Sequence, residues 1–420
     1  MLKLVSKNFG YNVDTTVDVA KAPFRKTINV PTSKSYANRL LILAALESKG
    51  ATIENIPAST DVLSMLEAFA QIGLKVEKLD EEKYFIKGPF PIVEYSEAGT
   101  PLYLETGDGG TTNRFLIPLL ARGVRRYRLR ASSHMKSRPM EELEIALTQM
   151  GVSVKRGGAS DDFWYEIQGP MCSIPSELKI DSSRSTQFAS GLCLALADCS
   201  TVVVANAIMA SESYFSLTQD LVKQFRAHKV NYRVPVDFSS LSYPLALALL
   251  GGEVHVRNCF ERDLFQADSL FLPLLEKLGA RLSFAPDGLH FAGVKSYQGF
   301  EFDCAPCPDL TPTLAFVAAH AQGESRLKNL GVLHYKESDR VREIIQVLKA
   351  FRCQYNYDSA NEILTITGRS GNFLATDISP PPDHRIIMMA YLFMRANQGG
   401  RLQNIEHVAK SFPGFFEIMS

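Results

Sequence analysis

A polar segment followed by an apolar helix recurs along the chain, and this repeat most constrains how the chain can fold. The first copy, PTSKSYANRLLILAALE at residues 31–47, places hydroxyl groups at a helix start and an apolar run behind them. A short strand, often closing on Asn, follows. The same plan is read at Ser33–Ile56, Gly110–Arg130, Ser185–Asn206, Ser240–Asn258, Thr311–Leu330 and Asp383–Ile405. The sequence therefore predicts one supersecondary unit used six times.

A second kind of helix is predicted between these copies. Apolar residues recur at helical spacing in four segments, and Gly73, Gly151 and Gly279 stand at the C-terminal turns of three of them. The segments are 65–76, 142–154, 271–282 and 344–355. Their apolar faces indicate packing against a core. Each repeat is therefore expected to contain two helices and short strands.

Length and charge limit the classes of protein to consider. A chain of 420 residues with 46% hydrophobic residues is too long for a single hydrophobic core and is typical of a globular protein with two domains. The 45 basic and 45 acidic residues give a formal net charge of zero, which removes any global case for nucleic acid or an anionic membrane as partner. No window reaches the roughly 18 unbroken apolar residues of a membrane span, and Met1–Lys26 lacks the apolar core of a signal peptide. The expected location is the cytoplasm.

The cysteines do not indicate a metal centre. There are seven, an odd number, scattered as expected for reduced thiols. Cys304 and Cys307 form the one close pair, with no second pair and no nearby His, which is a weak pattern for zinc. We interpret this segment as a loop and expect no metal.

Basic residues gather at or near the predicted helix heads. A helix N-terminus carries partial positive charge and is a natural anion site. Any one of these residues, taken alone, is better read as a solvated surface charge. As a set at equivalent points of a repeat, they predict a focused anion site in a neutral protein. They are Lys34, Arg39, Arg114, Lys136, Arg138, Lys336, Arg340, Arg385 and Lys410.

Two loops add chemistry to this picture. The glycines of GDGGTTNR at 107–114 allow backbone N–H groups to approach a bound group closely, although the spacing is neither that of a P-loop nor GxGxxG. The cluster KESDR at 336–340 can be read as a capped helix start. It can equally be a carboxylic acid held among cations to exchange a proton. The residues alone leave both readings open.

Seven segments together resemble the enolpyruvyl transferase family, in its order and spacing, from about residue 28 to the C-terminus. They are PTSKSYANR, GDGGTTNR, KSRPMEEL, SSRSTQF, YKESDR, DHR and AKSFPGFFE. The resemblance implies a two-domain α/β fold, an inside-out α/β barrel of six βαβαββ-type repeats, three per domain. We expect the chain to cross between domains near residues 32 and 236. One domain would then be continuous, 33–235, and the other discontinuous, 1–32 plus 236–420.

The resemblance is strongest to the shikimate-pathway branch of the family and implies its reaction in aromatic amino acid biosynthesis. The 5-hydroxyl of shikimate 3-phosphate attacks C2 of phosphoenolpyruvate, and the tetrahedral intermediate loses phosphate. The resemblance further implies no cofactor, a monomer, and closure of the domains around both substrates. Transfer to a UDP-aminosugar and a catalytically silent anion-binding protein remain as alternatives. Retention of both Asp309 and Glu337 argues against the silent protein.

The resemblance also implies roles for single residues. Asp309 would be the base for the hydroxyl, Glu337 the proton donor to the methylene carbon, and Lys34 a catalytic residue beside both substrates. The contacts implied for shikimate 3-phosphate are Lys34, Ser35, Arg39, Ser185, Thr186, Gln187, Ser211, Tyr214, Asp309 and Lys336. Those implied for phosphoenolpyruvate are Lys34, Gly110, Arg138, Gln187, Arg340, Arg385 and Lys410.

Four residues at or near these positions modify the expectation. Asp108 stands where the family usually has Asn, which would place a carboxylate near a phosphate and weaken phosphoenolpyruvate binding unless it is hydrogen-bonded or protonated. Glu212 and Ser213 replace a usual basic-Pro pair. Gly110 leaves room for a phosphonate mimic of phosphoenolpyruvate such as glyphosate, because a side chain there would project into the pocket.

Overall fold

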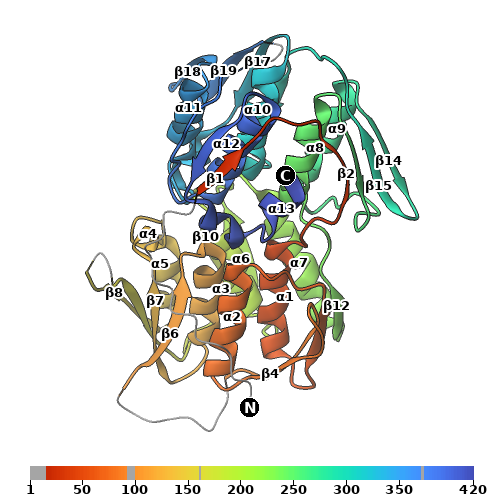
Figure 1. Ribbon diagram of the computed structural model, residues 1–420. Coiled ribbons are helices and arrows are strands. Elements are labelled where there is room, and N and C mark those ends of the chain that lie inside the picture. The colour runs from red at the N-terminus through yellow and green to blue at the C-terminus, as the bar shows by residue number, and fades with distance from the viewer. Residues whose placement is uncertain (1–15, 92–99, 160–161, 370–372) are drawn as a thin grey trace.

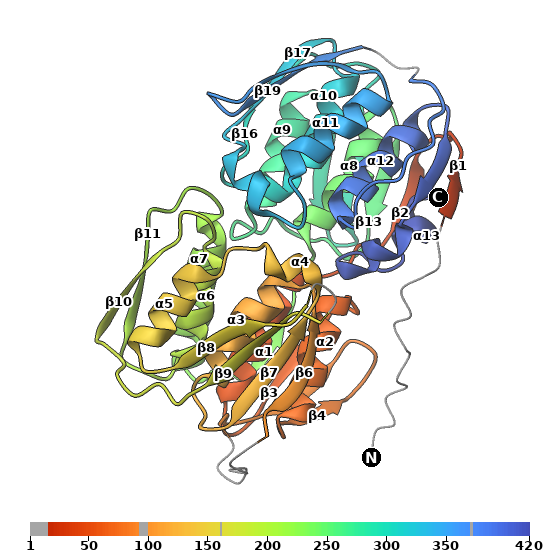
Figure 2. The ribbon, with the colours of Figure 1, turned by 90° about the vertical axis from the view of Figure 1, so that its left-hand side faces the viewer.

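The computed structural model describes residues 16–91, 100–159, 162–369 and 373–420, and it shows two lobes (Figures 1 and 2). Residues 1–15, where the expected discontinuous domain begins and which entered the signal-peptide argument, lie outside the described residues. No helix in the described ranges is long and apolar enough to cross a membrane.

Two repeats show the complete predicted unit, one in each lobe. In both, a parallel strand pair flanks a helix, and a second helix leads into an antiparallel hairpin, with strand orders β6-β7-β9-β8 and β16-β17-β19-β18. The first repeat consists of β6 Leu102–Gly107, α3 Gly110–Leu120, β7 Arg126–Ala131, α4 Ser133–Lys136, α5 Glu141–Gln149, β8 Ser153–Gly157 and β9 Trp164–Gln168. The second consists of β16 Glu301–Asp303, η2 Pro308–Leu310, α10 Thr311–His320, β17 Gly323–Lys328, η3 Gly331–Tyr335, α11 Arg340–Ala350, β18 Gln354–Asp358 and β19 Ile363–Gly368.

Two further repeats have the same sheet but take one strand from a distant part of the chain. The sheet orders are β12-β3-β5-β4 and β14-β15-β13-β2, with β12 parallel to β3 and β2 parallel to β13. The first group is β12 Asn231–Arg233, α1 Lys34–Leu46, β3 Ala51–Glu54, α2 Thr60–Gln71, β4 Lys75–Lys78 and β5 Tyr84–Lys87. The second is β2 Arg25–Ile28, α8 Phe238–Leu249, β13 Glu253–Val256, η1 Ala267–Leu270, α9 Phe271–Lys277, β14 Arg281–Ala285 and β15 Gly288–Ala292.

The last two repeats are reduced to two-stranded sheets. In one, β10 pairs in parallel with β11, and in the other β1 pairs antiparallel with β20. The first comprises β10 Glu177–Asp181, α6 Gln187–Ala195, β11 Val202–Asn206 and α7 Glu212–Arg226. The second comprises β1 Thr16–Val19, α12 His384–Ala396, β20 Gly400–Gln403, η4 Ile405–Lys410 and α13 Phe415–Met419. The repeated α/β architecture is thus confirmed, but the sheets of the described residues stay separate and form no closed barrel of strands.

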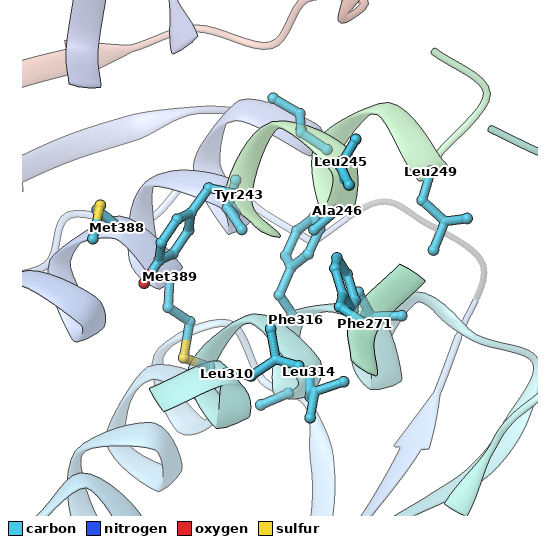
Figure 3. Packing of buried hydrophobic residues seen from close by; sticks show 14 of the residues in the cluster. Tyr243, Leu245, Ala246, Leu249, Phe271, Leu310, Leu314, Phe316, Met388 and Met389 are labelled. Atoms are coloured by element: carbon cyan, nitrogen blue, oxygen red, sulfur yellow. The ribbon is translucent and has the colours of Figure 1, made fainter. Parts of the chain in front are cut away.

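The first helix of each repeat lies inside its lobe. Every residue of α3, α8 and α10 is buried, which explains why these segments are apolar on all sides. In one lobe α1, α3 and α6 contact one another, and in the other α8, α10 and α12 do so. Figure 3 shows Tyr243, Phe316 and Met389 meeting in that second core. The second helices are amphipathic, and α11 buries only the face that includes Val341, Ile344 and Leu348.

Capping residues account for where these helices begin. Ser33 caps α1 as predicted, its hydroxyl accepting from Tyr36 N, and Asp339 caps α11 by accepting from Arg342 N. The predicted start of α8 at Ser240 was wrong by two residues. Asp237 caps that helix, and its carboxylate accepts from Ser240 N at 2.7 Å. Helix α6 begins at Gln187 rather than Ser185.

Two hydrophobic clusters fill the two lobes. One includes buried residues from 36 to 234, and the other those from 19 to 30 together with 236 to 419. The two chain connections between the lobes run side by side, joined by an antiparallel bridge between Thr32 and Val236. Ser33 N donates to Pro235 O at 2.7 Å, and Asp237 N donates to Pro31 O at 3.0 Å. We keep the domain boundaries near residues 32 and 236 as a proposal, which this arrangement supports.

Candidate active site

A polar cleft between the lobes receives side chains from both. The starts of α1, α3, α6 and α12 border it, together with η2 and the segment that precedes α11. Fourteen of the residues expected from the sequence line its walls. They are Lys34, Ser35, Arg39, Gly110, Arg138, Ser185, Thr186, Gln187, Ser211, Tyr214, Asp309, Lys336, Glu337 and Arg385.

Arg340 and Lys410 lie directly behind the wall instead of on it. Arg340 is 1% exposed, and its guanidinium binds Asp383, Glu337 and Asp309, with Nη1 donating to Asp309 Oδ1 at 2.8 Å. Lys410 is 5% exposed and donates to Asp108. Arg340 therefore reaches the cleft through Asp309 and Glu337, and Lys410 reaches it through Glu337, whose Oε1 lies 3.8 Å from Lys410 Nζ. Lys136, two residues before Arg138, is exposed and is not among the lining residues, so its inclusion in the predicted anion site was wrong.

Three cationic side chains surround the carboxylate of Asp309. Its two oxygens bind Arg340 Nη1 at 2.8 Å and Arg385 Nη2 at 2.9 Å, and Lys336 Nζ lies 3.4 Å away. Burial alone raises the pKa of this carboxyl, but Arg385, Lys336 and Arg340 hold its pKa well below the ordinary value. The carboxylate is therefore ionised and able to accept a proton once a cation is withdrawn.

Glu337 occupies the opposite position in the same cluster. Its Oε2 accepts from Arg340 Nη2 at 2.6 Å, while Oε1 lies 3.7 Å from Arg138 Nη1 and 3.8 Å from Lys410 Nζ. Burial raises the pKa of Glu337, and Arg340, Arg138 and Lys410 together bring that pKa well below its usual range. The two carboxylates thus share Arg340, and each is stabilised in its charged form by cations from more than one element.

Some buried arginine donors in the cleft form no hydrogen bond with the described residues. Arg138 is 7% exposed, and its Nε and Nη1 atoms form no hydrogen bond with the described residues. The buried Nε of Arg385 likewise has no hydrogen-bond partner among them. Buried donors left unsatisfied cost free energy, so this arrangement favours an anionic ligand that accepts from them. At Gly110 an added Cβ would lie 2.4 Å from Arg138 Nη1. The missing side chain therefore makes room for the guanidinium.

Arg39 and Arg114 organise other lining residues. Arg39 donates to Ser35 O, Thr218 Oγ1 and Tyr214 O, at 2.8, 2.8 and 3.1 Å, and all three of its nitrogens are engaged. Arg114 donates to Gln187 Oε1 at 2.9 Å, and Gln187 Nε2 donates to Thr111 Oγ1 at 3.0 Å. These contacts orient the head of α1 and the head of α6 toward the cleft.

Some lining residues were absent from the predicted site. Asp61 holds Lys34 Nζ at 2.8 Å, and nothing around it in the sequence marks it as a partner for that lysine. His384 is 2% exposed, and neither ring nitrogen has a hydrogen-bond partner in the described ranges. Burial and Arg385 keep the pKa of His384 well below its ordinary value, so the ring is neutral. Its place beside Arg385 in DHR was the only sequence signal for it.

The fold and the sequence both match known proteins. The EPSP synthase (3-phosphoshikimate 1-carboxyvinyltransferase) family model matches residues 19–228 and 223–419. Over 420 aligned residues the chain is 31% identical to the 3-phosphoshikimate 1-carboxyvinyltransferase of Methanosphaerula palustris, covering 95% of this chain and 97% of the relative. The enzyme of that name from Thermococcus kodakarensis is 31% identical over 411 residues, covering 94% and 96%.

Solved structures show the same fold at lower sequence identity. The EPSP synthase of Acinetobacter baumannii superposes with a TM-score of 0.70 at 21% identity, covering 96% of each chain. The enolpyruvyl transferase NikO of Streptomyces tendae superposes with a TM-score of 0.69 at 13% identity, also covering 96% of each chain. At these identities the likeness concerns the architecture alone.

Proposed function

The chain belongs to the EPSP synthase (3-phosphoshikimate 1-carboxyvinyltransferase) family, and we propose that its cleft transfers the carboxyvinyl group of phosphoenolpyruvate to the 5-hydroxyl of shikimate 3-phosphate. The protein is thus a transferase of the shikimate pathway. One observation carries the assignment to this cleft: Asp309 and Glu337 lie there together with arginines and lysines from both lobes. Two anionic substrates need these cations, and two proton transfers need two carboxyl groups.

The proposed reaction has two steps. In the addition, the 5-hydroxyl oxygen bonds to C2 of phosphoenolpyruvate, its proton passes to Asp309, and Glu337 gives a proton to the methylene carbon. In the elimination, the bond from C2 to the phosphate oxygen breaks, the new methyl group returns a proton to the Glu337 carboxylate, and the double bond forms again. Phosphate leaves, and the carboxyvinyl ether remains. Lys34, which lies at the start of α1, would stabilise charge between both substrates.

Substrate binding would prepare both carboxyl groups. In the proposed complex the carboxylate of phosphoenolpyruvate binds Arg385 and Arg340, and so draws positive charge away from Asp309. The phosphate accepts from Arg138 and Lys410, cations that now lower the pKa of Glu337. Neutralising them raises that pKa, which is the change a proton donor requires. Gly110, Gln187 and Lys34 would complete the phosphate contacts.

The acceptor would occupy the other side of the cleft. We propose that shikimate 3-phosphate binds the hydroxyl-rich heads of α1 and α6, with its reactive hydroxyl directed at Asp309. Tyr214, which lines the cleft and whose hydroxyl reaches Asp268 of the other lobe at 3.5 Å, would flank the ring. The residues assigned to this substrate are Lys34, Ser35, Arg39, Ser185, Thr186, Gln187, Ser211, Tyr214, Asp309 and Lys336.

We further propose that the protein acts as a cytoplasmic monomer whose lobes close around the substrates. The paired connections at Thr32 and Val236 form a natural hinge. All seven cysteines are free thiols, which suits a reducing compartment.

Phosphate release measures the proposed activity directly. Purified protein is supplied with phosphoenolpyruvate and either shikimate 3-phosphate or a UDP-aminosugar. We expect phosphate release when the acceptor is shikimate 3-phosphate and none when it is the UDP-aminosugar. Release only with the UDP-aminosugar would establish the alternative acceptor, and tight anion binding without release would identify a silent protein.

A further inference from the structure

Two histidines face each other on a sheet surface outside the cleft. His255 of β13 and His290 of β15 are directly paired in the antiparallel register. Their neighbours Val254 and Phe291 point into the core, so alternation along the strands places both imidazoles on the outer face. The rings stack with centroids 4.2 Å apart and 8° between their planes. Figure 1 shows this hairpin, β14 and β15, at the edge of its lobe.

A carboxylate meets both rings at the same end. Asp287 lies in the turn between β14 and β15, and its Oδ1 is 2.9 Å from His290 Nε2 while Oδ2 is 3.5 Å from His255 Nε2. His255 Nε2 also lies 2.9 Å from the backbone carbonyl oxygen of Asp287, so this one turn residue contacts both rings. One atom from each of the three side chains lies within 4.8 Å of the other two.

We propose that His255, His290 and Asp287 form a surface site for a divalent transition-metal ion such as Zn²⁺. A tetrahedral zinc ion holds its ligand atoms roughly 3.3 Å apart, close to the two nitrogen–oxygen distances already present. The antiparallel pairing brings both imidazoles together without any ion, and the stacked rings would tilt so that a nitrogen of each faces the ion. The remaining coordination positions face solvent, so water completes the shell.

The surrounding charges select the kind of cation. Arg25 and Arg281 line the same surface hollow, and they disfavour ions held by charge alone. Glu253 faces Arg25 in the strand register and offsets part of that charge. Two imidazole nitrogens suit zinc, copper and nickel, whereas calcium and magnesium require mostly oxygen ligands. The site is therefore expected to discriminate against the latter two ions.

A bound metal ion would link two parts of the sheet. The ion would join β13, which packs on α8, to the turn of the β14–β15 hairpin at the edge of the sheet. An ion that binds only the folded chain stabilises it. Zinc should therefore raise the melting temperature without altering phosphate release.

Zinc titration of the metal-stripped full-length protein, without substrates, tests the site. Isothermal calorimetry should show one equivalent in the wild type and at least about tenfold weaker binding in both His255→Ala and His290→Ala. His334→Ala is the matched control. His334 Nδ1 also pairs with a carboxylate, that of Asp339 at 2.9 Å, but among the described residues no second histidine joins this pair as a possible metal ligand. That variant should bind like the wild type.

Copper spectroscopy gives a readout that a change of stability would not imitate. Electron paramagnetic resonance of the Cu²⁺ protein should show two imidazole nitrogens, reduced to one in each single variant. No zinc binding to the wild type, or equal binding by wild type and both variants, would overturn the proposal. Calcium and magnesium at the same concentrations should give no stoichiometric binding.

Discussion

Lys410 Nζ lies 3.0 Å from Asp108 Oδ2 and also donates to Asp108 O, so one ammonium joins η4 to the glycine-rich loop of the opposite lobe. Burial raises the pKa of Asp108, but Lys410 outweighs burial and brings that pKa below its usual value. The carboxylate is therefore charged and occupies a lysine that the proposed phosphate contact needs. Asp108 therefore contributes an ion pair between the two lobes.

This pair predicts the effect of Asp108→Asn. The amide cannot compete for Lys410 as a charged group, so the KM for phosphoenolpyruvate should fall roughly tenfold, equivalent to about 1.4 kcal/mol. Steady-state phosphate release measures it. Glu212→Gln, which removes an exposed carboxylate at the other unusual position, should leave the KM unchanged. A KM that rises in Asp108→Asn would show that the carboxylate assists binding.

The proton-donor role of Glu337 predicts a separation of binding from turnover. Glu337→Gln should retain both substrates but lower kcat by roughly 10²–10⁴-fold, the usual loss when a proton-transfer group is removed. Calorimetry and phosphate release measure the two effects. Glu343→Gln changes a carboxylate on α11, the helix that follows Glu337; Glu343 pairs with Arg342 outside the cleft, and the variant should retain normal kcat. An unchanged kcat in Glu337→Gln would remove Glu337 from its role.

The contact of Gly110 with Arg138 predicts resistance to glyphosate. A methyl group at Gly110 would lie 2.4 Å from Arg138 Nη1, and the guanidinium must move away from it. Gly110→Ala should therefore be inhibited much less by glyphosate and should have a raised KM for phosphoenolpyruvate. Inhibition curves for both proteins measure this, and equal potency would contradict the predicted pocket.

His320 predicts a loss of stability in mild acid. It is 6% exposed, Nδ1 contacts Phe316 O at 2.8 Å, and burial lowers its pKa to about 4. The unfolded chain takes up this proton near pH 6.5, whereas the folded chain takes it up only near pH 4. Stability should thus be full above about pH 6.5 and decline by of order 3 kcal/mol toward pH 4.

Urea unfolding between pH 7 and pH 4 measures this dependence. His320→Gln should be less stable overall but should show a shallower decline over that range, because the titrating group is gone. His228→Gln changes an exposed histidine and should retain the wild-type dependence. Parallel curves for wild type and His320→Gln would reject the assignment.

The helix heads could be predicted because each carries its own local signal. Ser33 and Asp383 cap α1 and α12, and the apolar segments behind them are buried on all sides. The two strands that join a sheet from a distant part of the chain, β2 and β12, could not be predicted in the same way. β2 pairs with β13 and β12 with β3 across long stretches of chain, and no local pattern encodes such a pairing. The separate sheets likewise depend on how repeats pack, which is not visible within one repeat.

The cations of the site could be predicted as a group, but their partners could not. The pairing of Lys34 with Asp61 and the burial of Arg340 depend on where distant segments meet. Lys136 and Arg138 illustrate the limit within one segment. Lys136 is the last residue of α4 and Arg138 follows two residues later, yet Lys136 is exposed and Arg138 is buried in the cleft. Charge and spacing alone do not distinguish them.

The pairing of β2 with β13 also sets an order of events during synthesis. β2 leaves the ribosome before any of the lobe that contains α1, but its partner strand emerges only after that whole lobe is complete. β2 therefore remains without its partner strand while the lobe that contains α1 is synthesised. It can pair with β13 only afterwards, when the other lobe forms. A circular permutant that begins at residue 32 would place β2 after β13 in the chain and so remove this delay, while keeping the β2–β13 strand pair.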